Sequence, residues 1–498
     1  MHITLGSRQS HLAQKQAYMV KKRLESLGHK VDLFLKPSMG DLDLDLDLSS
    51  TDEKGVFTQD FTNLLLEKKV DCVVHSWKDL PIDLGGKTEV VATLEREDSR
   101  DLFFIKKNSL KKDSWTLLTS SPRREYHLKE FFDFLYNESI NFNFKAIRGN
   151  IPTRFKKFLE DSEADGFCVA LAAVKRLVGD DSFNQDYPGV WEALLKETEW
   201  CVLPESFCPS AAAQGALALE VLSERKDLIE ALSMINNEID RKAVIDERST
   251  LKAYGGGCHL AIGVQVYNTN YGSLKISSGQ HENETFKTIS FNSLWPYPKK
   301  IKESELWLSS LEAKSKRNQV ELSLDSKKSR ALLVTRKESF ETIKDQDYDE
   351  LFTSGLKTWK ALFDQGKWVN GCLDSLGMKL YPKDVFEKGI EEHSWLTRVG
   401  VEGPKDFKTY STYEVQTSVN ESSFEGKEYF AWMSGELLIK SLKDHPELKE
   451  KVHFVGLGRS FEAVEALMKE TGLVKGENLF PFYDTKQLKN DIVLDIVK

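Results

Sequence analysis

The N-terminal part of the chain repeats one pattern, in which short apolar runs alternate with stretches of helical periodicity. Residues 3–5 predict a buried strand, the apolar positions over residues 12–24 predict a helix, and residues 31–35 predict the next strand. The order returns with a helix over residues 57–66 and a strand over residues 70–74. Because strands that alternate with helices form one sheet with helices on both faces, the sequence predicts an α/β fold.

Polar and basic residues follow several of the predicted strands. Arg8 follows the first strand, and His75 to Asp79 follow the strand at residues 70–74. Basic residues also follow two later apolar runs, at residues 122–124 and 148–150. Ligands of open α/β sheets bind at the carboxyl ends of the strands, so the sequence predicts a binding site at these positions.

Length and composition narrow the possible classes of protein. With 498 residues the chain is expected to form three or four domains, and its net charge of -9 argues against a general nucleic-acid binder. The start of the chain has no leader-like segment, and no window approaches the ~18 apolar residues of a membrane span, so we expect a cytoplasmic protein without membrane contact. The six cysteines form no C-x-x-C pair, so neither a disulfide framework nor a zinc site is expected, and no other metal.

The segment Gly255-Gly256-Gly257-Cys258-His259 is the most unusual of the sequence. Three glycines remove side-chain bulk and permit positive φ, so the backbone can present the thiol of Cys258 on an exposed loop. The local spacing is equally compatible with a turn around a buried free cysteine. A cysteine hydrolase with His259 as the base is a further alternative, although adjacent side chains seldom face each other in an extended loop.

Together with Glu247 to Leu251 upstream, this segment resembles the cofactor-attachment signature of the hydroxymethylbilane synthase (porphobilinogen deaminase) family. The resemblance extends from about residue 3 to about residue 320, in blocks that keep the family's order: residues 6–17, 54–57, 75–81, 95–101, 119–124, 148–154, 170–177 and 213–217. It implies an enzyme that condenses four porphobilinogen molecules, with release of ammonia, into the linear tetrapyrrole hydroxymethylbilane of heme biosynthesis. It also implies that Cys258 carries a dipyrromethane cofactor through a thioether bond.

The family blocks imply roles for individual residues. Asp79 is implied to be the acid and base of the reaction, since such a group delivers and removes protons and stabilises a developing cation. Arginine suits the binding task, because porphobilinogen carries an acetate and a propionate, and guanidinium groups bind carboxylates in a bidentate manner. Porphobilinogen is therefore the expected small-molecule substrate. The protein is expected to be a monomer. The implied cofactor-binding residues are Lys78, Ser121, Arg123, Arg124, Arg148 and Gly149, and the implied substrate-binding residues are Arg8, Gln16, Lys54, Phe57, Arg154 and Arg176.

The sequence departs from the family pattern at three positions. Met39 stands where a basic residue is common, which puts one carboxylate contact in doubt. Ala213 stands where glycine is common, which puts the backbone geometry near the hinge in doubt, and Ala261 replaces a proline after Cys258. The alternating Leu-Asp tract at residues 42–48 is predicted to form a lid-like loop, and without the glycine and terminal glutamate of an EF-hand it is not expected to bind calcium.

The C-terminal part begins a new α/β pattern after a polar stretch at residues 318–330. Four short motifs resemble the uroporphyrinogen-III synthase family, whose members cyclise the bilane: residues 335–336, 352–354, 433–435 and 455–460. The resemblance implies a second activity that acts on the product of the first, and no catalytic residues are assigned to it. Residues 456–458 lack a complete G-x-G-x-x-G motif, so nucleotide binding is not expected.

These resemblances imply four regions. We expect a first periplasmic-binding-protein-like lobe at residues 1–96, completed by about residues 198–216, and a second lobe at residues 97–197, each with a mixed sheet. A small α+β cofactor-bearing domain is expected at residues 217–322, and a uroporphyrinogen-III-synthase-like α/β domain at residues 329–498. A two-lobed small-molecule anion-binding protein without catalysis is the main alternative, since paired α/β lobes around an anion-lined cleft also serve that purpose.

Overall fold

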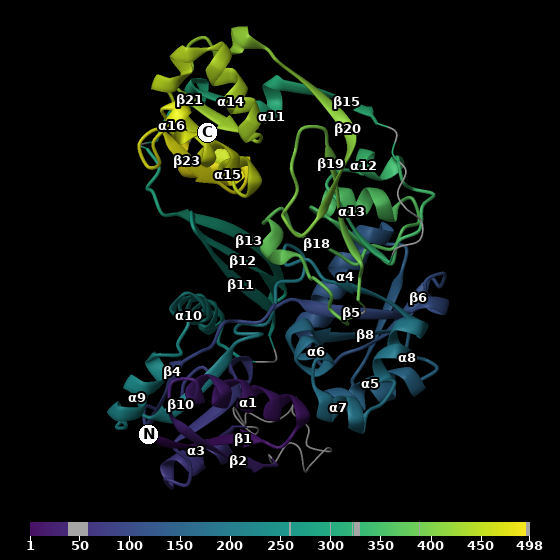
Figure 1. The fold of residues 1–498 in the computed structure, drawn as a ribbon, viewed down its shortest axis with the longest axis vertical. Coiled ribbons are helices and arrows are strands. Elements are labelled where there is room, and N and C mark those ends of the chain that lie inside the picture. Colours follow the sequence, from purple (N-terminus) through teal and green to yellow (C-terminus); the bar gives the residue numbers. More distant parts are fainter. Residues whose placement is uncertain are drawn as a thin grey trace. The chain divides into compact units, whose positions relative to one another are not determined.

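The computed structural model describes residues 1–37, 58–257, 260–298, 300–320, 322, 329–387 and 389–494 (Figure 1). Among these residues, no helix is long and apolar enough to cross a membrane. The chain divides into two compact units. Unit 1 contains Met1–Val266, Ile276–Thr288 and Pro382–Gly389, and unit 2 contains Tyr267–Lys275, Ile289–Tyr381 and Ile390–Lys498. Every described residue that the sequence analysis assigns to catalysis or binding lies in unit 1.

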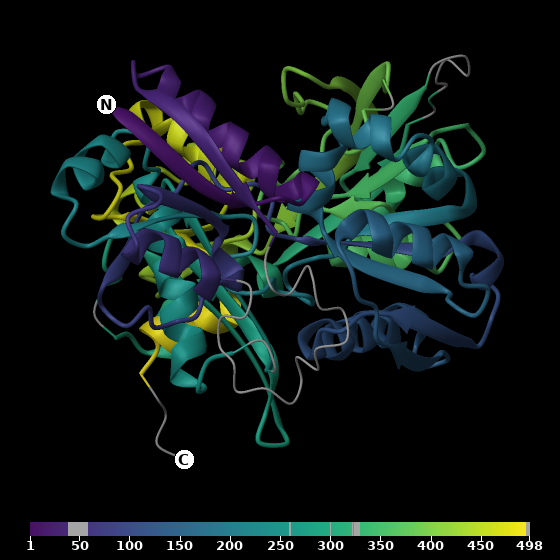
Figure 2. The same cartoon turned by 90° about the horizontal axis from the view of Figure 1, so that it is seen from below.

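The first lobe of unit 1 contains the strands β1 (His2–Arg8), β2 (Lys30–Lys36), β3 (Cys72–Ser76), β4 (Thr88–Ala92) and β10 (Leu217–Leu222), and the helices α1 (His11–Glu25), α3 (Gln59–Leu66) and α9 (Lys226–Ser233). Its sheet has the order β2-β1-β3-β10-β4. β1 is parallel to β2 and β3, whereas β10 is antiparallel to β3 and β4. α1 packs along β1 and β2 through Ala17, Val20 and Leu24, which recur at helical spacing and are fully buried (Figure 2).

The second lobe repeats this architecture with the strands β5 (Asp101–Lys106), β6 (Ser114–Leu118), β7 (Asn141–Lys145), β8 (Gly166–Ala170) and β9 (Thr198–Val202), and the helices α4 (Pro122–Tyr136), α5 (Ile151–Glu160), α6 (Leu171–Val178), α7 (Asp181–Asp186) and α8 (Val190–Glu197). Its sheet has the order β7-β6-β8-β5-β9. β6 is parallel to β7 and β8, whereas β5 is antiparallel to both of its neighbours. The predicted pair of α/β lobes with mixed sheets is therefore confirmed.

The return crossing to the first lobe lies later in the chain than the sequence analysis places it. Residues 198–216 are predicted from the sequence to complete the first lobe. In the structure β9 pairs with β5 in the second sheet, and β10 completes the first sheet. Both segments are short apolar runs, and such a run indicates that a strand is buried without indicating which strand it pairs with.

The two lobes are connected by two crossing segments, residues 93–100 and 203–216, which meet at Gly215. Its φ of +86° lies in the left-handed region, and a Cβ at this position would lie 2.4 Å from the carbonyl oxygen of Glu97. Glu97 also donates its backbone N–H to the Gly215 carbonyl at 3.4 Å. A side chain at Gly215 therefore requires one of the two crossing segments to move.

We expect Gly215→Ala to lower the free energy of unfolding by about 3 kcal/mol, because it adds left-handed strain and a backbone overlap. Gly86→Ala is the matched control. Its φ is +79°, but open space surrounds the Cβ position, so it should cost about 1 kcal/mol. Urea unfolding followed by tryptophan fluorescence measures both losses. Equal losses would show that the crossing segments are not in contact.

One helix and a three-stranded sheet follow the first lobe: α10 (Glu238–Ala253), β11 (Ala261–Thr269), β12 (Gly272–His281) and β13 (Glu284–Ser293). Between α10 and β11, Gly255, Gly256 and Gly257 have φ values of +92°, +65° and +129°. The glycines thus adopt the backbone region that only glycine enters freely. Several predicted features lie outside the described residues: Met39, the tract at residues 42–48, Lys54, Phe57, Cys258 and His259.

Unit 2 contains two sheets, built from β14 (Leu306–Leu308), β15 (Ala313–Gln319), β16 (Arg330–Val334), β17 (Glu350–Thr353), β18 (Gly371–Cys372), β19 (Glu392–Arg398), β20 (Lys408–Val419), β21 (Tyr429–Trp432), β22 (Val452–Gly456) and β23 (Leu479–Phe482). The sheet orders are β15-β20-β19-β16-β17-β18 and β14-β21-β22-β23. β14 and β15 fall in the region that the sequence analysis assigns to the cofactor-bearing domain, yet they pair with β21 and β20. The helices include α12 (Lys337–Glu341), α13 (Leu356–Phe363), α14 (Gly435–Asp444), α15 (Arg459–Ala466) and α17 (Thr485–Ile492).

Candidate active site

The loop after β3 places one carboxylate at the surface. Trp77 and Leu80 are buried in one hydrophobic cluster, and Trp77 donates its backbone N–H to the carbonyl of Ala216 at 3.0 Å. Asp79 lies between these two anchors and is exposed. The short 3-10 helix η1 (Trp77–Asp79) thus holds a carboxylate in a fixed position outside the core.

A buried ion pair holds α10 against the crossing segments. Arg96 donates from both terminal nitrogens to the Glu247 carboxylate, at 2.6 and 2.9 Å. The same carboxylate accepts the backbone N–H of Ala213 at 2.8 Å. Ala213 has a φ of +68°, in the region where glycine is favoured. The alanine is therefore accommodated near the hinge with a strained backbone that the bond to Glu247 holds in place.

Arg248, also on α10, donates to three backbone carbonyls of the loop at residues 77–81. Its terminal nitrogens lie 3.1 Å from the carbonyl oxygen of Trp77, 3.2 Å from that of Leu80 and 2.6 Å from that of Pro81. Because one planar group makes all three bonds, it fixes the path of the loop on both sides of Asp79. The helix that leads toward Cys258 is thus attached directly to the segment that carries Asp79.

A chain of hydrogen bonds leads from this loop to the second lobe. Lys78 donates from Nζ to Oε1 of Gln214 at 3.2 Å, and Gln214 donates from Nε2 to Oδ1 of Asp101 at 2.9 Å. Burial lowers the pKa of Lys78, and the negative charges of Asp79 and Asp101 oppose this shift. The ammonium group is therefore held in a partly desolvated position within the reach of two carboxylates.

Asp101, the first residue of β5, binds two arginines at the start of α4. Its Oδ2 accepts from Arg123 at 2.7 Å and its Oδ1 accepts from Arg124 at 2.8 Å, and the residue is 1% exposed. Burial alone would raise the pKa of Asp101, but the charges and hydrogen bonds of the two arginines outweigh it and hold this pKa well below its ordinary range. The same pairing raises the pKa of Arg124, although burial opposes the shift. Asp101 is therefore a permanent anion that directs both guanidinium groups.

The start of α4 concentrates positive charge. Ser121 is the N-cap and Pro122 the first residue, so the helix begins shortly after β6 ends. Arg123 and Arg124 therefore lie in the first turn, where the helix macrodipole is positive and disfavours cations. The Nε atoms of both arginines are buried and have no hydrogen-bond partner in the part of the chain that the structure describes. Unbalanced positive charge of this kind favours a bound anion.

A second group of cations lies at the start of α5. Gly149 has a φ of +113°, and its carbonyl accepts from Nε of Arg154 at 2.7 Å. The pKa of Arg154 is lowered to about 10, first by burial and then by the positive charge of Arg124, and Arg148 adds to the shift. Asp79 opposes the shift. The carboxylate of Asp79 therefore lies within the electrostatic reach of Arg154.

The other predicted binding residues have different surroundings. Gln16 is buried and exchanges hydrogen bonds with Ser76, at the end of β3, at 3.0 and 3.3 Å. Arg176 is buried in α6 and donates to the carbonyl of Gly215 at 2.7 Å, and burial lowers its pKa to about 10. Arg8 ends β1 and is half-buried. The residues that share one electrostatic environment are Lys78, Asp79, Asp101, Arg123, Arg124, Arg148 and Arg154.

Positive charge exceeds negative charge in this group of described residues. Its carboxylates are those of Asp79 and Asp101, and its five cations are Lys78, Arg123, Arg124, Arg148 and Arg154. A ligand with several carboxylates fits such a group, because each carboxylate can accept from a guanidinium or ammonium group. The residues present therefore fit an anionic cofactor and an anionic substrate.

Three residues of this site receive no role in the sequence analysis, although each lies in a block that resembles the family: Asp101, Gln214 and Arg248. Asp101 opens an apolar strand, and a carboxylate buried there needs a cationic partner, which is a signal that the sequence does contain. No spacing signal identifies the other two, because Gln214 lies 136 positions from Lys78 and Arg248 lies 171 positions from Trp77.

Comparison with known proteins concerns about half of the chain. Residues 3–230 match the family model described as porphobilinogen deaminase, dipyromethane cofactor binding domain, which confirms the predicted cofactor. The porphobilinogen deaminase of Desulfitobacterium hafniense is 36% identical over 267 residues, which cover 52% of this chain and 79% of that protein. The porphobilinogen deaminase of Nostoc sp. is 32% identical over 272 residues, covering 53% of this chain and 77% of that protein. That of Chromobacterium violaceum is 34% identical over 267 residues, covering 52% and 78%.

Solved structures give a weaker comparison. The methionine binding protein MetQ is 11% identical with a TM-score of 0.26, covering 51% of this chain and 96% of its own. The aliphatic sulphonate binding protein SsuA from Escherichia coli has the same identity of 11% and TM-score of 0.26, covering 51% and 70%. Scores this low carry no argument about the fold. The sequence relatives decide the matter: since more than three-quarters of each deaminase is matched at over 30% identity, the chain belongs to the porphobilinogen deaminase family.

Proposed function

We propose that the chain is a hydroxymethylbilane synthase, which condenses four porphobilinogen molecules, with release of ammonia, into the linear tetrapyrrole hydroxymethylbilane of heme biosynthesis. Its family membership supports this activity. The observation that carries the proposal is the exposed carboxylate of Asp79 beside a group of five cations. The reaction needs one proton-transfer group among several receptors for carboxylates, and this arrangement supplies both.

Substrate binding follows from charge. Each porphobilinogen carries an acetate and a propionate, so every added unit brings two more carboxylates into the site. Arg123 and Arg124 present guanidinium groups whose directions Asp101 fixes, and Arg148 and Arg154 add two more near the start of α5. In this proposal Arg123, Arg124 and Arg148 bind the carboxylates of the cofactor, to which the substrate units are added. The substrate-binding residues are Arg8, Gln16, Lys54, Phe57, Arg154 and Arg176.

The dipyrromethane cofactor, joined to Cys258 by a thioether, supplies the pyrrole carbon to which substrate units are added. We assign its carboxylates to Lys78, Ser121, Arg123, Arg124, Arg148 and Gly149. The unpartnered Nε atoms of Arg123 and Arg124 support this assignment. Burial and the charge of Arg124 lower the pKa of Arg154, and carboxylates nearby would favour its charged form again.

We assign proton transfer to Asp79. It donates a proton to the leaving amine of porphobilinogen, and its carboxylate then faces the cation that the departure leaves. It also accepts the pyrrole ring proton after each coupling, so one group serves all three steps. The bonds from Arg248 and the buried side chains of Trp77 and Leu80 keep it in position.

We expect Arg248→Ala to lower kcat by about ten- to a hundredfold with a smaller change in KM, because it releases the loop that positions Asp79. Steady-state assays with porphobilinogen measure both constants. Arg241→Ala is the matched control, since Arg241 is also on α10 but donates to the carbonyl of Val90, outside the loop. Similar kinetics in the two variants would contradict a positioning role for Arg248.

We further propose that the C-terminal part cyclises hydroxymethylbilane to uroporphyrinogen III. The four motifs that resemble uroporphyrinogen-III synthase lie at the carboxyl ends of β16, β17, β21 and β22. β16 is parallel to β17, and β21 is parallel to β22, an arrangement in which ligands bind at that end of the strands. Ser354 donates from Oγ to the carbonyl of Thr335 at 2.8 Å, which links two of the motifs.

Incubation of the purified protein with porphobilinogen tests both proposals. The first predicts that porphobilinogen is consumed and ammonia is released, and binding without turnover would overturn it in favour of a two-lobed anion-binding protein. The second predicts that the type III isomer of uroporphyrinogen is formed. The type I isomer alone would overturn the second proposal and leave the first intact.

A further inference from the structure

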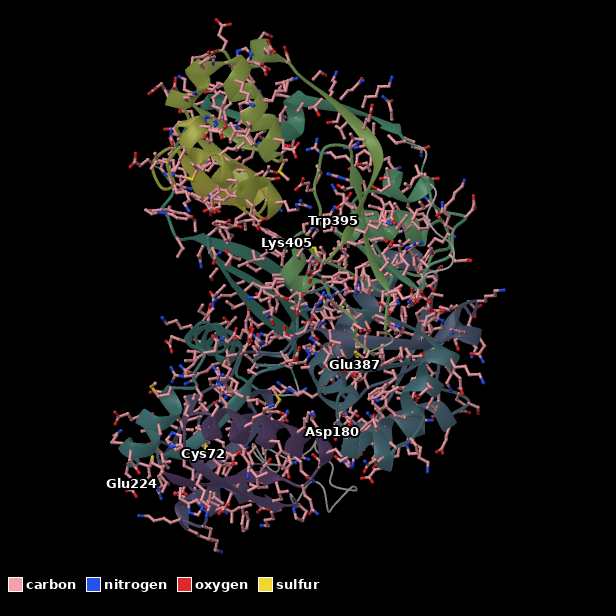
Figure 3. The ribbon with its side chains drawn as sticks, in the orientation of Figure 1. Cys72, Asp180, Glu224, Glu387, Trp395 and Lys405 are labelled. Atoms are coloured by element: carbon pink, nitrogen blue, oxygen red, sulfur yellow. The ribbon has the colours of Figure 1, made fainter. Side chains whose placement is uncertain are left out.

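A short segment of the C-terminal region belongs to unit 1. Pro382–Gly389 is part of that unit, whereas the chain on both sides of it, up to Tyr381 and from Ile390, is part of unit 2. Glu387, labelled in Figure 3, lies beside Gly179, the residue that follows α6. The segment therefore leaves one unit, contacts the second lobe in the other, and returns.

Phe386 is the residue that enters the second lobe. Its ring centroid lies 5.3 Å from that of Trp200 on β9, in an edge-to-face arrangement, and 6.0 Å from those of Phe104 on β5 and Trp191 on α8. Phe386 is 7% exposed, and the preceding Val385 is 2% exposed. Such aromatic pairs contribute more than the area that they bury. The segment is therefore packed into the lobe and does not merely rest on it.

The backbone of the segment is shaped for this contact. Asp384 and Glu387, on either side of the buried pair, have φ values of +46° and +49°, which side chains other than glycine rarely adopt. Glu387 donates its backbone N–H to the carbonyl of Asp384 at 3.1 Å and so closes a turn. A strained turn of this kind persists only when surrounding contacts hold it, and the burial of Val385 and Phe386 supplies those contacts.

The receiving surface is built by the second lobe itself. Trp191 packs against Phe155 at 5.1 Å and Phe183 at 5.4 Å, both residues of that lobe. Withdrawal of the segment would therefore leave an aromatic surface whose walls stay in place. We propose that residues 382–389 are a docking segment that tethers the C-terminal part of the chain to the second lobe, with Phe386 as its anchor.

The tether has a consequence that rests on the proposed function. If unit 1 makes the bilane and unit 2 cyclises it, an attachment in addition to β11, β12 and β13, each of which runs from one unit into the other, further limits how far the two catalytic parts separate. The local concentration of unit 2 near newly released bilane is then higher than these three strands alone would give.

Distance measurement between two spin labels in the full-length holoenzyme tests the tether directly. The labels go on cysteines introduced at Lys111 in unit 1 and Glu450 in unit 2, both exposed, while Cys72, Cys168, Cys201, Cys208 and Cys372 are buried. We expect one narrow distance distribution in the parent chain. Phe386→Ala should widen it to about twice its width or more, because the anchor is lost. Phe386→Leu, which keeps an apolar side chain and guards against misfolding, should give an intermediate width.

Phe407→Ala is the matched control, because Phe407 packs against Tyr381 at 4.9 Å and His393 at 5.6 Å within unit 2 and has no part in the segment. It should leave the distribution unchanged. A Phe386→Ala distribution as narrow as that of the parent chain would overturn the proposal, as would a parent distribution already as wide as that of Phe386→Ala.

Product analysis separates this inference from the proposed function. Phe386→Ala should consume porphobilinogen within about twofold of the parent rate, because Phe386 touches no reacting group, while its fraction of type III isomer falls. If the parent chain forms type I isomer alone, the cyclase proposal fails and the distance measurement still decides the tether. If the parent forms type III isomer and the variant forms the same fraction, the functional consequence of the tether is wrong.

Discussion

Asp79→Asn is expected to lower the turnover of porphobilinogen by about 10²–10⁴-fold while the fold and the bound dipyrromethane persist. Asparagine keeps the shape of the side chain but carries neither a transferable proton nor a negative charge that faces a cation. The carboxylate is exposed, so its loss leaves the packing of Trp77 and Leu80 intact. Steady-state rates, together with the melting temperature and the intact mass of the variant, check the three parts of the expectation.

Asp83→Asn is the matched control for this prediction. Asp83 is exposed a few residues further along the chain, where its Oδ1 accepts the backbone N–H of Gly85 at 2.9 Å. Its replacement should change turnover by less than about twofold, because it lies outside the group of cations. Wild-type turnover in Asp79→Asn, or an equal loss in both variants, would refute the assignment of proton transfer to Asp79.

Asp101→Asn is expected to lower the free energy of unfolding at neutral pH by about 3–5 kcal/mol, because it leaves Arg123 and Arg124 without their buried counter-charge. The arginines hold the pKa of Asp101 well below its ordinary range in the folded state. A depressed pKa gives stability that is fully present above the unfolded value of about 4 and is lost as the pH falls toward the folded value. The difference between parent and variant should therefore be largest near pH 7 and narrow in acid.

Urea unfolding at several pH values measures this difference. Asp133→Asn is the matched control, because Asp133 pairs with the exposed Lys129 one turn away on α4, and a pair of this spacing contributes less than about 1 kcal/mol. A loss in Asp101→Asn no larger than that of the control would contradict the role of Asp101 as the fixed anion of the site. A loss that grows in acid would contradict the depressed pKa.

The α/β character of the two lobes follows from the sequence because it depends on local periodicity. The helix predicted over residues 12–24 is α1 (His11–Glu25), and the strand predicted over residues 31–35 is β2 (Lys30–Lys36). In both cases the spacing of apolar residues indicates which face of the helix or strand is buried, and this spacing can be read from consecutive residues.

The pairing of strands that lie far apart in the sequence could not be predicted in the same way. β10 completes the first sheet although it begins 141 positions beyond the end of β3. β14 and β15 join sheets of unit 2, although the sequence analysis assigns them to the cofactor-bearing domain. The burial of Phe386 in the second lobe leaves no local signal either. An apolar residue in the sequence indicates that its side chain is buried, but the residues that it packs against depend on the tertiary fold.

The candidate site shows the same division. The cations at Arg123, Arg124 and Arg148 were accessible to sequence reasoning because they follow predicted strands, and Arg154 was implied by the family resemblance. In the structure Arg154 interacts electrostatically with Arg124, Arg148 and Asp79. The role of Arg248 was not accessible, since the loop that it binds lies far away in the chain. The sequence signal at Asp101 indicates a cationic partner but does not identify the two arginines that it binds. The individual roles of these residues, and those of Cys258, Lys54 and Phe57 outside the described residues, stay predictions.

The claim on which the account depends is that Cys258 carries a covalent primer made of substrate-derived pyrrole units. Intact-mass spectrometry of the purified protein, before and after exposure to porphobilinogen, tests it most directly. The account predicts a mass that exceeds that of the polypeptide by two pyrrole units, and no such excess in Cys258→Ser. A parent protein that weighs no more than its polypeptide after this exposure, or a Cys258→Ser variant that carries the same excess as the parent, would contradict it.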